Sequence, residues 1–275
     1  MNIRYSFMLS AVALASALVS CKSGTKKETT SAEPSIKEEI VSYDTDSIKL
    51  TNYVYYDENL KGPRPAILVI HEWWGLNDYA RMRARKLAEL GYIAMAVDMY
   101  GNGQTADNPA RAQELSTPFY MNPQLAKTRV DMALENLKKN PHADGTRTAI
   151  IGYCFGGAVA LGTARLGSDF KAAVSFHGNL NVVPANKDLL KAEVLVCHGA
   201  ADPFVPPAEV EQFKKQMDSI GARYTFKAYE GAVHAFSNPA ATALGEKFNI
   251  PIKYDAAADT ASWNDMKTFF KQVLQ

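Results

Sequence analysis

Five short apolar runs without polar alternation recur along the chain. Such runs are typical of strands covered on both faces, and they occupy residues 66–70, 93–97, 148–151, 172–176 and 194–197. Stretches with helical periodicity lie between or after them, at residues 78–90, 124–137, 157–166, 209–220 and 262–274. This alternation predicts one α/β domain of three layers around a mostly parallel sheet. Residues 47–56 and 224–229 are predicted to add more exposed strands to that sheet.

The composition supports a well-packed globular domain. The 275 residues include 30 Lys and Arg against 29 Asp and Glu, a net charge of +1, and 47% are hydrophobic. This balance excludes a disordered chain and a strongly basic nucleic-acid-binding protein. The length suits one large domain or two small ones, and the regular alternation of strands and helices favours one.

The first 21 residues have the pattern of an export signal followed by a lipid anchor. Arg4 precedes an apolar run over residues 5–19, and the tetrapeptide LVSC ends at Cys21. The run is too short and too rich in alanine for a transmembrane helix, and LVSC resembles the lipobox of bacterial lipoproteins. We therefore expect a signal peptide over 1–20 and an exported protein anchored to a cell-envelope membrane through lipid on Cys21. The alternative is an ordinary secretory signal in which Cys21 is incidental.

Residues 21–42 differ in composition from the rest of the chain. They are rich in Lys, Glu, Thr and Ser and contain almost nothing apolar before Ile36. Such a composition predicts a flexible tether between the lipid and the domain. The folded domain is then predicted to occupy residues 43–275.

The segment GYCFGGA, residues 152–158, follows one predicted strand and opens the next predicted helix. It matches the G-x-S-x-G nucleophile elbow with Cys154 in place of the Ser. Gly152 and Gly156 flank the nucleophile because side chains there would collide with the neighbouring strand and helix. The turn would project the thiol over the sheet, and the helix N-terminus favours a thiolate. The alternative is that Cys154 is a small buried core residue.

A nucleophile needs a base and an orienting acid, which follow an elbow of this kind in the order acid, then His. Asp202 comes directly after the strand at 194–197, and His234 lies just beyond the strand at 224–229. Asp202 is expected to fix the tautomer and orientation of the imidazole. Taken singly, a turn-forming Asp and a loop His are common alternatives. The remaining histidines are predicted to be structural or solvated, with His71 a candidate for the pocket wall: His71, His142, His177 and His198.

The segment HEWWG, residues 71–75, follows the first of the buried strands. It begins like the zinc motif H-E-x-x-H, but Gly75 stands where the second His is needed and the context is not a helix, so no metal is expected. The backbone N–H groups of Trp73 and Phe155 are predicted to form an oxyanion hole. Alternatively, Trp73 and Trp74 are core or pocket-lining residues.

Four separated strings carry a resemblance to a known family: residues 71–101, 152–158 (GYCFGGA), 198–206 (HGAADPFVP) and 231–236 (GAVHAF). Together they resemble the dienelactone hydrolase family over about Ser47 to Gln275, which implies the α/β-hydrolase fold. The resemblance also implies that a Glu joins the Cys, His and Asp, and Glu72 matches it. That Glu would take the thiol proton when substrate arrives. The residue pattern alone predicts only that a carboxylate near the thiol disfavours the thiolate.

Asn238 departs from the pattern of the lactone-degrading members of that family. The resemblance implies an Arg there, four residues after His234, that binds a substrate carboxylate, and a second such Arg in the region of Arg111. Without a bidentate Arg, selectivity for an anionic lactone loses its main physical source. The exported location suggests an external ester, lactone or acylated polymer as substrate.

Cys197 is predicted to be a core residue. In the family's strand order it lies two strands from the elbow, roughly 10 Å away, which exceeds the Cα separation of about 7 Å that a disulfide tolerates. We therefore expect no disulfide with Cys154. The sequence also has no C-x-x-C motif, which argues against a thiol redox enzyme.

Two functions from different classes follow. The first is a cysteine-dependent hydrolase of ester or lactone bonds that works through an acyl-enzyme on Cys154, with a small-molecule substrate and no cofactor. A monomer is favoured, but the sequence leaves the oligomeric state open. The second is a non-catalytic, membrane-anchored binding protein with the same fold. The presence of the elbow with its candidate base, acid and Glu72 favours the first, because a binding module has no reason to keep a strained turn.

Overall fold

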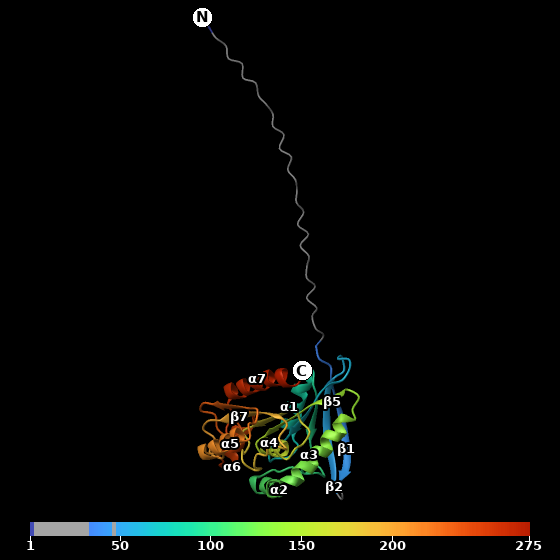
Figure 1. Ribbon diagram of the computed structural model, residues 1–275, viewed down its shortest axis with the longest axis vertical. Coiled ribbons are helices and arrows are strands. Elements are labelled where there is room, and N and C mark those ends of the chain that lie inside the picture. Colours follow the sequence, from blue (N-terminus) through green and yellow to red (C-terminus); the bar gives the residue numbers. More distant parts are fainter. Residues whose placement is uncertain (3–32, 46–47) are drawn as a thin grey trace. The chain divides into compact units, whose positions relative to one another are not determined.

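The computed structural model describes residues 1–2, 33–45 and 48–275 (Figure 1). A folded unit runs from Pro34 to Gln275. Residues 3–32, which include most of the predicted signal peptide, Cys21 and the first part of the predicted tether, lie outside the described residues. Within the described ranges, no helix is long and apolar enough to cross a membrane.

The folded unit is built on an eight-stranded sheet with the order β1-β2-β4-β3-β5-β6-β7-β8. Strands β3 to β8 run parallel to one another, whereas β2 is antiparallel to both β1 and β4. The mostly parallel sheet predicted from the apolar runs is therefore confirmed. The strands are β1 (Ile36–Thr45), β2 (Ile48–Asp57), β3 (Arg64–Ile70), β4 (Ile93–Val97), β5 (Ala143–Tyr153), β6 (Ala172–Phe176), β7 (Glu193–Gly199) and β8 (Tyr224–Tyr229).

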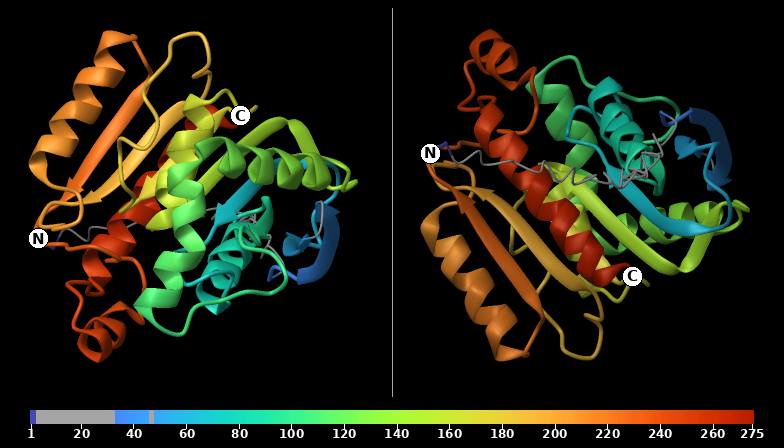
Figure 2. Two further views of the ribbon diagram at one scale, coloured as in Figure 1. Left: turned by 90° about the horizontal axis from the view of Figure 1, so that it is seen from below. Right: turned by 90° about the horizontal axis from the view of Figure 1, so that it is seen from above.

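Helices cover both faces of the sheet, which gives the three predicted layers (Figure 2). One face packs against α1 (Asp78–Glu89) and α7 (Ala256–Val273), and the other packs against α3 (Pro123–Lys138), α4 (Phe155–Arg165) and α5 (Pro207–Ser219). Strands β3, β4 and β6 and the second half of β5 are buried between the two apolar clusters, which explains why their sequences lack polar alternation.

The structure adds two helices that the periodicity did not reveal, α2 (Pro109–Met121) and α6 (Ala241–Phe248). Helix α2 starts at a capping pair in which the Asn108 side chain accepts from the N–H of Arg111 and Pro109 follows at the first helical position. The Asn-Pro pair is a recognisable signal for a helix start in the sequence. Helix α6 has eight residues, too few for a periodic pattern to stand out.

Strand β1 lies partly inside the range 21–42 that the composition predicts to be a tether, so that prediction is wrong for residues 36–42. The strand pairs with β2 along its whole length, and this edge position requires little apolar surface. Its acidic side chains are bonded to neighbours: Tyr56 donates to Glu39 at 2.7 Å, and Arg81 donates to Glu38 at 3.1 Å. The fold therefore begins near Pro34 rather than at residue 43.

The elbow between β5 and α4 is a tightly packed turn. Cys154 has a φ of 53° and a ψ of −116°, a conformation that is strained for a side chain with a Cβ. A Cβ added to Gly152 would lie 1.9 Å from the carbonyl oxygen of Gly156, and a Cβ added to Gly156 would lie 2.3 Å from the carbonyl oxygen of Ile70. The turn can therefore form only with glycine at both flanking positions.

Replacing Gly152 with alanine should unfold or strongly destabilise the domain, because the new methyl group would overlap backbone rather than a movable side chain. We expect a loss of at least about 3 kcal/mol in the free energy of unfolding, measured by urea titration. The control is Gly145→Ala, whose new Cβ would meet only the flexible side chain of Lys138. Equal stability of the two variants would contradict this packing argument.

Candidate active site

The candidate catalytic residues lie at the carboxyl ends of four parallel strands, where ligands bind in sheets of this kind. Glu72 follows β3, Cys154 follows β5, Asp202 follows β7 and His234 follows β8. Glu72, Cys154 and His234 line one cavity of about 370 Å³. Most of its other walls are aromatic or aliphatic, and they include Trp73, Trp74, Tyr120, Phe204, Ala235, Ile250 and Ile252.

His234 and Asp202 form a buried pair behind the cavity. The Nδ1–H of His234 donates to Oδ2 of Asp202 at 2.8 Å, and the other carboxylate oxygen accepts from the N–H of Phe204 at 2.8 Å. This arrangement leaves Nε2 of His234 as the nitrogen that can exchange a proton. Burial disfavours the imidazolium, but the charge of a Cys154 thiolate and the hydrogen bonds with Asp202 and Cys154 raise the pKa of His234 to about 10.

The thiol of Cys154 is the partly exposed member of the site. Its backbone N–H donates to the carbonyl of Phe176 at 3.0 Å and to Nδ1 of His177 at 3.1 Å, so two acceptors hold the turn. The side chain stands at the start of α4, whose N-terminal dipole stabilises negative charge. The geometry therefore combines an accessible thiol with a nearby imidazole and a helix N-terminus.

The loop of Trp73 lies beside the elbow, as an oxyanion hole requires. In the described part of the chain, the backbone N–H groups of Trp73 and Phe155 have no hydrogen-bond acceptor. The loop is held from behind, because Tyr100 donates to the carbonyl of Trp73 at 3.0 Å and Nδ1 of His71 donates to the carbonyl of Glu72 at 2.5 Å. Two free donors on fixed backbone are what a developing oxyanion needs.

Glu72 is a buried carboxyl without a neighbouring cation in hydrogen-bond contact. The side-chain amide of Asn238 donates to its Oε2 at 2.6 Å. Burial raises the pKa of Glu72 to about 7, although the Asn238 hydrogen bond and the charges of His234 and Arg83 partly oppose the shift. Near neutral pH this carboxyl can therefore both accept and release a proton.

His177 is the residue whose role the sequence did not reveal. It is fully buried directly after β6, and burial holds its pKa well below the usual range, so the ring is neutral. Because Nδ1 accepts from the N–H of Cys154, Nε2 carries the proton and donates to Oγ of Ser237 at 2.7 Å. Ser237 in turn shares a 2.7 Å hydrogen bond with Tyr79. The sequence signal for a role of His177 was its position directly after the strand predicted at residues 172–176.

The other sequence candidates are placed away from the cavity. His71 is buried between Tyr100 and Phe155 and does not line the cavity, so the prediction of a wall residue is wrong. Arg111 pairs with Glu114 at 2.6 Å and also stands outside the lining. Cys197 is fully buried in β7 with a free thiol, two strands from β5. The described residues contain no cluster of three or more His, Cys, Asp or Glu that could hold a metal ion.

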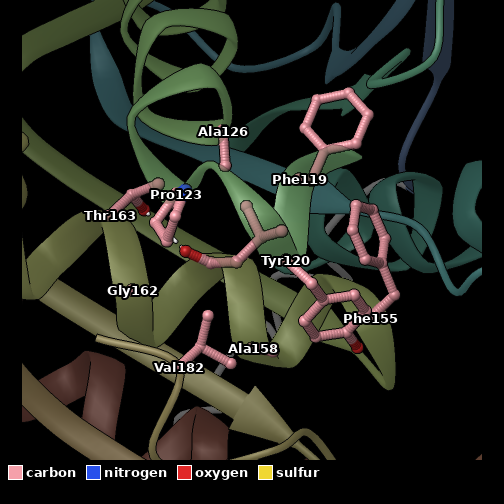
Figure 3. Close-up of a pocket in the computed structure, with 10 residues that line it drawn as sticks. Phe119, Tyr120, Pro123, Ala126, Phe155, Ala158, Gly162, Thr163 and Val182 are labelled. Atoms are coloured by element: carbon pink, nitrogen blue, oxygen red, sulfur yellow. Dashed lines mark hydrogen bonds between the residues drawn. The ribbon is translucent and has the colours of Figure 1, made fainter. Parts of the chain in front are cut away.

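A second, much smaller crevice lies behind the cavity, where α2 and α3 meet α4 (Figure 3). Its free space is about 10 Å³, which is room for a single water at most. Tyr120 borders both spaces, and its ring packs edge-on against Phe155 with centroids 5.7 Å apart. Tyr120 therefore lies between the two spaces.

Comparison with known proteins places this arrangement in a family. The model of the dienelactone hydrolase family matches residues 50–274. A provisionally named carboxymethylenebutenolidase of Aquifex aeolicus is 28% identical over 242 residues, which cover 86% of this chain and 99% of that protein. The crystal structure of a dienelactone hydrolase-like promiscuous phosphotriesterase from metagenomic libraries superposes with a TM-score of 0.82 at 34% identity, over 87% of this chain and 99% of that one.

Sequence and structure agree along the folded unit. The family match covers β3 to α7 in full, including all four strand ends that carry the candidate residues. The eight-stranded, mostly parallel sheet between two helical layers is the α/β-hydrolase fold of the matched structure. The chain therefore belongs to the dienelactone hydrolase family and is a carboxymethylenebutenolidase-like hydrolase.

Proposed function

We propose that this hydrolase cleaves carboxylic ester or lactone bonds through an acyl-enzyme on Cys154. The observation that carries the proposal is the position of the thiol, on a strained turn that opens into the same cavity as His234. A strained backbone persists only where the surrounding structure enforces it, and such strain is concentrated at functional sites. A non-catalytic binding protein would gain nothing from this turn.

In the proposed reaction, the thiol loses its proton and the thiolate attacks the carbonyl carbon of the substrate. The carbonyl oxygen becomes an oxyanion that accepts hydrogen bonds from the N–H groups of Trp73 and Phe155. The C–O bond then breaks. His234 enters the reaction as the imidazolium, since its pKa is about 10, and its Nε2–H protonates the departing alkoxide, which in a lactone stays attached to the acyl group. Water next attacks the thioester while the now neutral His234 takes one of its protons. The C–S bond breaks, the carboxylic acid leaves, and the proton held on Glu72 returns to the thiolate of Cys154.

Glu72 is the proposed first acceptor of the thiol proton. It lines the same cavity as Cys154, and its pKa of about 7 matches the range in which a general base works near neutral pH. The family resemblance assigns the corresponding Glu this step on substrate arrival. Asn238 holds the carboxyl in place through a single neutral hydrogen bond, so the carboxyl is positioned without an ion pair.

Replacing Cys154 with alanine is expected to lower kcat/KM for short 4-nitrophenyl esters by at least about a thousandfold, because the acyl-enzyme cannot form. The control is Cys197→Ala, since that thiol is fully buried two strands away. Iodoacetamide should inactivate the wild type and the Cys197→Ala variant alike, with one added carbamidomethyl group on Cys154 by mass spectrometry. Undiminished hydrolysis by Cys154→Ala would refute the proposal.

Replacing Glu72 with glutamine should slow turnover yet stabilise the fold at high pH. The pKa of the Glu72 carboxyl rises from 4.5 to about 7 on folding, so between these pH values the folded state keeps a proton that the unfolded chain releases. The stability of the wild type therefore falls as pH rises through that window. The variant is expected to be more stable at pH 8 by up to about 3 kcal/mol and nearly equal to the wild type at pH 4. Urea unfolding at both pH values measures the difference.

The exposed residue Glu211 of α5 supplies the control, as Glu211→Gln. A Glu72→Gln variant that unfolds more easily at pH 8 would show that the carboxyl has a structural role instead. Unchanged ester turnover in a stably folded Glu72→Gln variant would remove its assignment as a base.

We also propose that the protein is an exported lipoprotein whose hydrolase domain meets substrates outside the cytoplasm. The support is the LVSC string that ends at Cys21 after an apolar run. Cells that express the wild type should incorporate radiolabelled palmitate into the protein, and Cys21→Ser should abolish the label. Labelling that survives in Cys21→Ser would contradict the proposed anchor.

A further inference from the structure

We propose that the catalytic cavity selects esters that carry no charge, and that Asn238 is a residue that determines this selectivity. The proposal rests on the ester hydrolysis argued above and names the substrate class of that site. It follows from the charges that the structure places in and around the cavity.

The wall of the cavity carries no Lys or Arg among its described residues. Its ionisable groups include the carboxyl of Glu72, the thiol of Cys154 and the imidazole of His234. Any positive charge on His234 is balanced by Asp202, whose carboxylate lies 2.8 Å from Nδ1. A substrate carboxylate would therefore lose its water in a largely apolar space without gaining a free cation, which is strongly unfavourable.

Two arginines that could supply a positive charge to the site, Arg83 and Arg111, are bonded to other groups. Arg83 is 2% exposed, donates to the carbonyl of Ser237 and pairs with Asp259 at 2.6 Å. Arg111 belongs to α2, which also lines the cavity, but its guanidinium is bonded to Glu114 and Gln104. Neither charge is free to bind a substrate anion.

Asn238 supplies no positive charge either, and both ends of its amide make hydrogen bonds. Its Nδ2 donates to Glu72 at 2.6 Å, and its Oδ1 accepts from the N–H of Ala240 at 2.9 Å. The side chain is 4% exposed, so water does not compete for these bonds. An arginine here would bring a cation next to Glu72, whereas asparagine leaves the negative charge of Glu72 uncompensated by direct contact.

The same charges affect the product. Hydrolysis converts an uncharged ester into a carboxylate, and the cavity that disfavours an anionic substrate also disfavours an anionic product. Product release is thereby favoured in every cycle.

The experiment compares three esters of matched length with the full-length enzyme: 4-nitrophenyl valerate, mono(4-nitrophenyl) glutarate, and the methyl ester of the latter. Each kcat/KM is divided by the rate constant for hydrolysis of the same ester by hydroxide, which corrects for differences in intrinsic reactivity among the three esters. The wild type should prefer both uncharged esters over the glutarate monoanion by at least about tenfold. Asn238→Arg should reduce this preference about tenfold, and Asn238→Gln, which adds no charge, should keep it.

The outcomes separate the two proposals. If the wild type hydrolyses the glutarate monoanion as well as its methyl ester, and Cys154→Ala hydrolyses neither, charge selectivity is refuted while the cysteine mechanism stands. If hydrolysis of all three esters is absent or survives in Cys154→Ala, both proposals fall. An Asn238→Arg variant that folds but keeps the wild-type preference would refute the role of Asn238. Should Asn238→Arg not fold, the wild-type ratio of the monoanion to its methyl ester still decides whether the cavity selects uncharged esters, and Asn238→Lys takes its place as the test of residue 238.

Discussion

The close backbone contact between Gly156 and Ile70 is the constraint on which the rest of the site depends. Ile70 ends β3, and the next residues supply Glu72 and the N–H of Trp73. Gly156 lies in the first turn of α4, two residues after the thiol. Because no side chain separates the two backbones, the thiol, the proposed oxyanion donors and the carboxyl are held at fixed separations. The positive φ of Cys154 is the strain that accompanies this contact.

A single loop after β8 then connects the remaining parts. His234 lies in this loop and is oriented by Asp202. Three residues further on, Ser237 accepts a hydrogen bond from His177, and His177 accepts one from the N–H of Cys154. The next residue, Asn238, donates to Glu72. One loop thus carries His234 and also contacts His177, which holds the elbow, and the carboxyl of Glu72. A shift of this loop would change all three together, which explains why these small polar residues are buried.

The sequence predicted the parts of the fold that local physics determines. Buried parallel strands such as β3 and β4 are recognisable because an unbroken apolar run has few other uses, and the elbow is recognisable because its glycines have a steric reason. Strand β1 was missed because its stability comes from pairing with β2 and from partners such as Tyr56, which no local pattern encodes. The role of His177 was missed for the same reason, since it depends on Cys154 and Ser237, both distant in sequence.

The charges at the site follow from one rule, that a buried charge needs a partner. Arg83 has Asp259, and His234 has Asp202, but within the described part of the chain Glu72 is hydrogen-bonded only by the neutral amide of Asn238. Its carboxyl therefore holds a proton up to a pKa of about 7, where an ion pair with an arginine would keep it ionised. The identity of residue 238 thus sets two properties together. With asparagine, the proposed base titrates near neutral pH, and the described residues of the cavity wall include no Lys or Arg to retain an anionic substrate or product.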